Sequence, residues 1–127
     1  FLRMLSECHD DDWAKHVKGF LLVSPVVSPQ YIENLKPFIS NITEIDFKPI
    51  LTLPIKYWHI YNVNDSYLDT RNSELLKKIM TEAHADYKIE PLDTKEYDLH
   101  FGGFTHYPLK EVNEGLVSLL NEINPNL

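Results

Sequence analysis

The pattern of elements along the 127-residue chain predicts an α/β fold with a mostly parallel sheet of about three strands. Two near-continuous apolar runs, Val17–Ser24 and Ile55–Val63, are typical of strands that are buried on both faces of a parallel sheet. Tyr87–Leu92 predicts the third strand. Segments with apolar residues at helical spacing separate and follow these strands, which favours right-handed crossovers between parallel strands.

The helices are predicted from their apolar periodicity. The sequence predicts a short helix at Leu2–Cys8 and another at Pro29–Ile39, because proline suits the first turn of a helix. Longer helices are expected at Thr70–Ala83 and Leu109–Ile123, where each segment carries an apolar stripe. Ser40–Pro54 is weakly patterned and interrupted by proline, so it predicts loops and a single turn of helix.

The composition is that of a folded domain and excludes several classes of function. With 43% hydrophobic residues the chain can bury a core, so residues 1–127 are expected to form a single domain or a partial domain. A net charge of −7 argues against a binder of duplex nucleic acid, since phosphate contacts need clustered Lys and Arg. No apolar stretch reaches the ~18–20 residues that a membrane span requires.

The cysteine and histidine content argues against disulfides and metals. Cys8 is the only cysteine, so no intrachain disulfide can form and a reducing compartment, the cytoplasm, is expected. The histidines lack the spacing of zinc ligands, and the acidic run of residues 9–13 lacks the glycine of a calcium loop. We therefore expect no metal and no cofactor.

Candidate chemistry lies where strands end, because function collects at the carboxyl ends of strands in open α/β sheets. An aspartate follows the second strand, and histidines lie in the glycine-containing loop His100–Pro108 before the last helix. Asp followed by His is the second part of the order Ser, Asp, His that α/β-hydrolases use. A neutral His accepts the proton of a serine hydroxyl, while an Asp orients the ring and stabilises the imidazolium.

Three segments resemble the FSH family of serine hydrolases, small eukaryotic esterases of the α/β-hydrolase superfamily. WHIYNVNDSYLDTRNSELLKKI (58–79) is similar to the strand, turn and helix that carry the family's acid. The family's terminal histidine loop and last helix resemble HFGGFTHYPLKEVNEGLVSLLNEI (100–123). The strand that follows the family's nucleophile helix resembles VKGFLLVSPVVSP (17–29). The resemblance covers nearly the whole chain but only about the second half of a family member.

This resemblance implies the identity of two catalytic residues. Asp65 takes the place of the triad acid, with Asp69 in the same turn as the second candidate. The family pattern places the base directly after two glycines, where this chain has Phe104. Either the loop carries a two-residue insertion and His106 is the base, or the base is absent; the proline that follows His106 favours the insertion. His100 matches an earlier, non-catalytic histidine of the family.

The nucleophile is expected outside the sequence. No serine lies in a G-x-S-x-G motif, and the family order places that motif just before Phe1. The resemblance thus implies the C-terminal half of an α/β-hydrolase, a carboxylesterase or thioesterase that acts on a small acyl ester or thioester. The chain alone is expected to be inactive. No residue is assigned to substrate binding.

Two alternatives remain at this stage. One is a non-catalytic relative, in which Phe104 replaces the base and the domain acts as a scaffold or partner-binding module. A stand-alone flavodoxin-like domain is the other, but no glycine-rich phosphate loop follows any predicted strand. Half a sheet exposes a strand edge and an apolar face, which predicts a homodimer or pairing with the missing N-terminal half.

Overall fold

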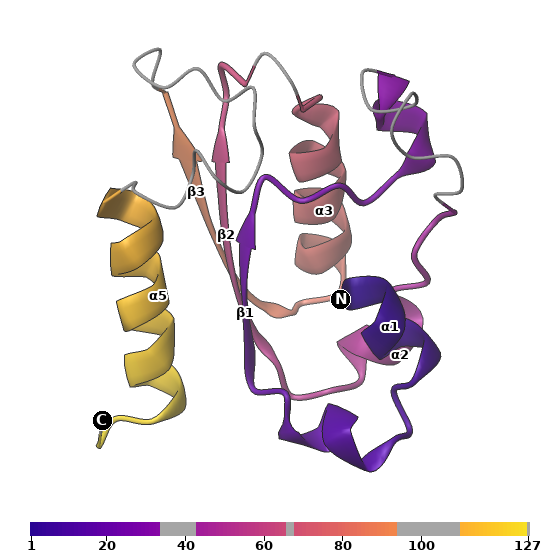
Figure 1. Ribbon diagram of the computed structural model, residues 1–127, viewed down its shortest axis with the longest axis vertical. Helices are drawn as coiled ribbons and strands as arrows, with labels where there is room; N and C mark the ends of the chain where they lie inside the picture. The colour runs from indigo at the N-terminus through magenta and orange to yellow at the C-terminus, as the bar shows by residue number, and fades with distance from the viewer. Residues whose placement is uncertain (34–42, 66–67, 94–109, 127) are drawn as a thin grey trace.

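The centre of the protein is an open sheet of three parallel strands in the order β1-β2-β3 (Figure 1). The computed structural model describes residues 1–33, 43–65, 68–93 and 110–126. Within them β1 spans Gly19–Val23, β2 spans Lys56–Asn62 and β3 spans Asp86–Leu92. The predicted α/β class with about three parallel strands is confirmed. That the sheet is part of a hydrolase stays a prediction.

Helices cover both faces of this sheet. α5 (Lys110–Ile123) lies on one face, and α1 (Leu2–Glu7), α2 (Lys48–Leu51) and α3 (Arg71–Glu82) lie on the other (Figure 1). The bounds of α1, α3 and α5 agree with their predicted ranges to within one residue at each end. α2 is the single helical turn that was expected within Ser40–Pro54.

The helix predicted at Pro29–Ile39 is wrong in its first turn. The described part is a short 3₁₀ helix, Pro29–Tyr31, which Ser28 caps by accepting a hydrogen bond from Gln30 N at 3.2 Å. The carbonyl of Tyr31 accepts a hydrogen bond from the side chain of Asn72 at 2.8 Å, and the backbone of Ile32 leaves helical geometry. A tertiary contact therefore competes with the continuation of the helix. Residues 34–42 lie outside the described part of the chain.

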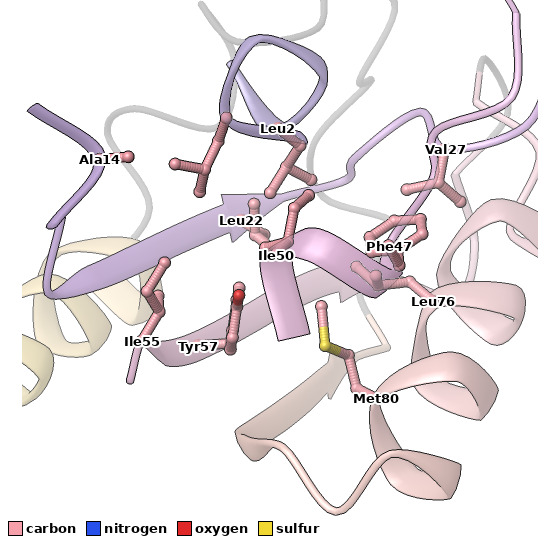
Figure 2. Packing of buried hydrophobic residues seen from close by; sticks show 11 residues of the cluster. Leu2, Ala14, Leu22, Val27, Phe47, Ile50, Ile55, Tyr57, Leu76 and Met80 are labelled. Atoms are coloured by element: carbon pink, nitrogen blue, oxygen red, sulfur yellow. The ribbon is translucent and has the colours of Figure 1, made fainter. Parts of the chain in front are cut away.

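The larger apolar cluster fills the space between the sheet and the helices α1, α2 and α3. Figure 2 shows Ile50 of α2 and Met80 of α3 near Leu22 of β1 and Tyr57 of β2. The buried members of the cluster are Leu2, Leu5, Ala14, Leu22, Val27, Phe47, Ile50, Ile55, Tyr57, Leu76 and Met80. Because elements from α1 to α3 contribute to it, this cluster fixes the position of α3 against the sheet.

The other face of the sheet carries a smaller cluster under α5. Ile60 and Val112 are buried there, with Trp58 packed against them. Gly115 allows α5 to approach closely, because an added Cβ would lie 3.0 Å from Ile60 Cδ1 and 3.1 Å from Trp58 Nε1. The strand β2 therefore alternates its side chains between two apolar layers, as its near-continuous apolar sequence predicts.

Candidate functional site

A small polar pocket lies at the carboxyl ends of β1 and β2. Its volume of about 10 Å³ gives room for roughly one water-sized atom. The lining residues are Ser24, Pro25, Tyr61, Asn62, Asp65, Leu68, Asp69, Thr70 and Ser73. Parallel strands bring their carboxyl ends to the same edge of the sheet, so both acids that the sequence singled out meet here.

Asp65 is held in the turn that follows β2. Its backbone N–H donates to the carbonyl of Asn62 at 3.1 Å, and its Oδ1 accepts from the N–H of Leu68 at 2.9 Å. The side chain is half-buried. A carboxylate fixed by a backbone donor keeps one orientation, which an acid that orients a histidine ring requires.

Asp69, the second candidate acid, is engaged by a neighbouring cation. Its carboxylate accepts from the backbone N–H of Arg71 at 2.9 Å and from the guanidinium Nε at 3.0 Å. These hydrogen bonds from Arg71 lower the pKa of Asp69. Asp69 is therefore held in an ion pair with Arg71 at the edge of the pocket.

The predicted base, His106, falls with Phe104 and His100 within residues 94–109, which lie outside the described part of the chain. The pairing of Asp65 with His106 therefore stays a prediction from the sequence.

His59 lies at the centre of a buried hydrogen-bond network that the sequence did not reveal. The ring is fully buried on β2, with Nδ1 2.6 Å from Tyr87 Oη on β3 and Nε2 2.9 Å from Ser73 Oγ on α3. Burial lowers the pKa of His59 to about 4, so the imidazole is neutral at neutral pH. A neutral ring has one donor and one acceptor, which matches a hydroxyl on each side.

Ser73, His59 and Tyr87 have the connectivity of a nucleophile, a base and an orienting group, but they are poorly suited to catalysis. Ser73 is only 3% exposed, so a substrate carbonyl has little access to its hydroxyl. A base with a pKa of about 4 has little driving force to accept a proton at neutral pH. We interpret the network as the link that fixes the start of α3, and with it one wall of the pocket, to β2 and β3.

Acidification is expected to destabilise the protein through His59. The folded-state pKa of about 4 lies below the ordinary value of 6.5, so the unfolded chain binds more protons between these pH values. The contribution of His59 is present in full above about pH 6.5 and is lost as the pH falls to 4, which amounts to about 3 kcal/mol. Urea unfolding across this pH range measures it.

The matched variant for this measurement is His59→Gln, which keeps a polar side chain but cannot titrate. It is expected to be less stable at pH 7, because glutamine does not reproduce both hydrogen bonds. Its free energy of unfolding should change less between pH 6.5 and pH 4 than that of the wild type. Equal pH slopes for the two proteins would show that another group carries the acid sensitivity.

Asn72 joins the loop after β1 to the first turn of α3. Its Oδ1 accepts hydrogen bonds from the N–H groups of Val27 and Ser28, both at 3.1 Å. Its Nδ2 donates to the carbonyls of Tyr31 at 2.8 Å and Asp69 at 3.2 Å. This buried amide thus uses all of its donors and acceptors. It holds the two walls of the pocket together.

Metal and thiol chemistry find little support in the described residues. They contain no group of three or more His, Cys, Asp or Glu side chains close enough to hold a metal ion. Partial burial and the nearby carboxylates of Asp11 and Glu7 raise the pKa of Cys8, which disfavours the reactive thiolate. No helix in this part of the chain is long and apolar enough to cross a membrane.

Fold and site together define an α/β protein with a small polar pocket at the carboxyl edge of a parallel sheet. No protein-family model matches the chain, and no curated protein or solved structure matches it either.

Proposed function

We propose that the chain is the C-terminal half of a serine hydrolase of the carboxylesterase or thioesterase type, related to the FSH family. Asp65 is the acid of its catalytic triad and His106 the base. The nucleophilic serine belongs to sequence upstream of Phe1. The substrate is a small acyl ester or thioester, the reaction uses no cofactor, and the enzyme works in the cytoplasm.

The position of Asp65 carries the proposal. It follows a central parallel strand, it lines a pocket at the carboxyl edge of the sheet, and a backbone donor orients its carboxylate. The sequence adds a histidine in a glycine-containing loop before the last helix, in the chain order of α/β-hydrolases.

In the proposed reaction the serine Oγ attacks the acyl carbon and gives its proton to the neutral ring of His106. Asp65 accepts a hydrogen bond from the other ring nitrogen and stabilises the imidazolium. Backbone N–H groups near the serine stabilise the tetrahedral oxyanion. His106 then returns the proton to the leaving alcohol or thiol. Water releases the acid from the acyl-enzyme by the same steps.

A fluorophosphonate probe tests this proposal on the full-length protein. We expect covalent labelling of one serine, and mass spectrometry should locate it in a G-x-S-x-G motif upstream of Phe1. Residues 1–127 alone should remain unlabelled, which provides the control for non-specific reaction. A full-length protein that takes up no probe, or that has no such motif, would contradict the proposal.

The second candidate is a non-catalytic scaffold or partner-binding module. Three apolar side chains on α5 favour it, since Leu116, Val117 and Leu120 are 42%, 57% and 43% exposed. β1 pairs only with β2 within the described residues, so one edge of the sheet is also open to a partner there. Pairing with an N-terminal half, or a homodimer, would cover such surfaces. An unlabelled full-length protein would favour this candidate.

A further inference from the structure

The outer edge of β1 is open to a second strand. The N–H of Ser24 donates to the carbonyl of Ile60 on β2 at 2.9 Å, and the backbone groups of every second residue in a strand face the same way. The even-numbered residues of β1 therefore pair with β2. The odd-numbered residues turn their N–H and C=O groups away from β2; they are Gly19, Leu21 and Val23. Within the described residues no strand lies on that side.

The opposite edge of the sheet, on β3, is protected against such pairing. The carbonyl of Leu92 accepts from Val63 N at 2.8 Å, so the even-numbered residues of β3 face β2 and Pro91 faces outwards. A proline at an outward position offers no N–H to a further strand, and the charged side chains of Lys88 and Glu90 also discourage pairing. β1, with the sequence GFLLV, contains neither proline nor charge. It is therefore the edge that a partner can extend.

One flank of α5 adds apolar surface above this edge. α5 packs on Gly19 of β1 through Leu119, and on its other flank Glu122 binds a lysine of β3. Leu116 and Leu120 lie ~120° and ~160° around the helix from Glu122, beyond the positions that face the sheet. They are thus on the flank nearer the edge of β1, where they are 42% and 43% exposed.

Apolar surface also lies beside this edge on the other face of the sheet. A groove of about 390 Å³ lies next to β1 there, and its lining includes Phe1, Phe20 and Leu22. Phe1 is 66% exposed. Arg3, which also lines the groove, donates to Thr43. A strand that extends the sheet at β1 must therefore present apolar side chains to both faces.

A second copy of the chain fits this edge through a two-fold axis at Leu21. Such an axis pairs β1 with its copy in the antiparallel direction, which places Leu21 opposite Leu21 and Gly19 opposite Val23. The larger side chain thus lies opposite a glycine. On the groove side Phe20 lies opposite Leu22, and apolar cross-strand pairs of this kind stabilise a sheet. Because β1 carries no charge, no like charges meet along the strand, although each copy has a net charge of −7.

The same axis brings the two α5 helices together. α5 lies over both β1 and β2, because it packs on Gly19 of β1 and its Gly115 packs on Ile60 of β2. With strands ~4.8 Å apart, the axes of the two helices would lie about 10 Å apart. Helices pack at ~8–10 Å, so Leu116 and Leu120 of each copy would cover those of the other. One partner therefore covers both the strand edge and the exposed flank of α5.

We propose that two copies of the chain associate through β1, in the antiparallel direction, to form one continuous sheet with the two α5 helices packed side by side. This inference goes beyond the proposed function and does not rest on it, since neither Asp65 nor His106 takes part in the interface.

Sedimentation equilibrium of the 127-residue chain at micromolar concentration tests this interface. We expect twice the mass of one chain. Leu21→Pro should give a folded monomer, because it removes an N–H that faces the second copy and none that faces β2, as Pro91 does in β3. Leu120→Glu should raise the dissociation constant roughly tenfold or more, since it places two carboxylates in an apolar contact. Far-UV circular dichroism checks that each variant is folded, and Leu120→Glu keeps the test available if Leu21→Pro does not fold.

Ile89→Pro is the matched control, because residue 89 faces outwards on the protected edge of β3. It should leave the dimer intact. A monomeric wild-type chain, a folded Leu21→Pro chain that remains dimeric, or an unchanged dissociation constant for Leu120→Glu would overturn the interface, whatever the fluorophosphonate test says of the hydrolase. A monomeric full-length protein in which the Leu21 amide exchanges slowly would assign this edge to an upstream strand, which would also overturn it.

Discussion

Asparagine in place of Asp65 is expected to reduce the kcat of the full-length protein about 10⁴-fold, if the proposed triad is correct. The amide has nearly the shape of the carboxylate, so the hydrogen bond from Leu68 N to Oδ1 can persist and the turn after β2 can keep its geometry. What the variant loses is the negative charge that selects the ring tautomer of the base and stabilises its imidazolium. Turnover of p-nitrophenyl butyrate, measured alongside Tm, checks this.

Asp69→Asn is the matched control for this variant. It removes a carboxylate from the same pocket, but one whose charge Arg71 already compensates. We expect it to change kcat less than tenfold and to weaken only the start of α3, where Asp69 accepts from Arg71 N. A large loss of kcat in Asp69→Asn with little loss in Asp65→Asn would exchange the roles of the two acids.

The periodicity of apolar residues predicted the helices and strands because this pattern depends only on residues that are close together in the sequence. The apolar runs around β1 and β2, and the helical stripes of α3 and α5, each contain the information that sets their conformation. In open α/β sheets function collects at the carboxyl ends of parallel strands, so Asp65 and Asp69 were predicted to lie at one edge of the sheet. Both residues line the pocket there. These predictions needed no knowledge of distant contacts.

The interior of the site was not predictable in this way. His59 lies 14 residues from Ser73 and 28 from Tyr87, and Asn72 binds backbone groups more than 40 residues away. No spacing between nearby residues of the sequence identifies such partners. The apolar run that contains His59 predicts only that the strand is buried. The positive φ of Ser24 was equally hidden, because the usual signal for that conformation is glycine. The first turn after Pro29 differs from the predicted helix for the same reason, a contact from Asn72.

Alanine in place of His106 is expected to have the largest effect of all, a loss of about 10⁶-fold in the kcat of the full-length protein. Without a base the serine keeps its proton, and the leaving group receives none. Fluorophosphonate labelling should become undetectable on the time scale of the wild-type reaction. His100→Ala is the control, since His100 matches a non-catalytic position of the FSH pattern. A variant that loses activity at His100 instead would exchange the roles of the two histidines.

The shifted position of His106 can be tested with a second change. Phe104 occupies the place where the FSH pattern has its base, directly after Gly102 and Gly103. If the loop carries an insertion that brings His106 to the base position, Phe104→His in the His106→Ala background should restore little activity, because residue 104 then points elsewhere. Recovery to within tenfold of the wild type would show that the loop follows the family spacing. An active wild type whose kcat is insensitive to His106→Ala would remove His106 from the mechanism, because a serine hydrolase requires a base within hydrogen-bond reach of its nucleophile.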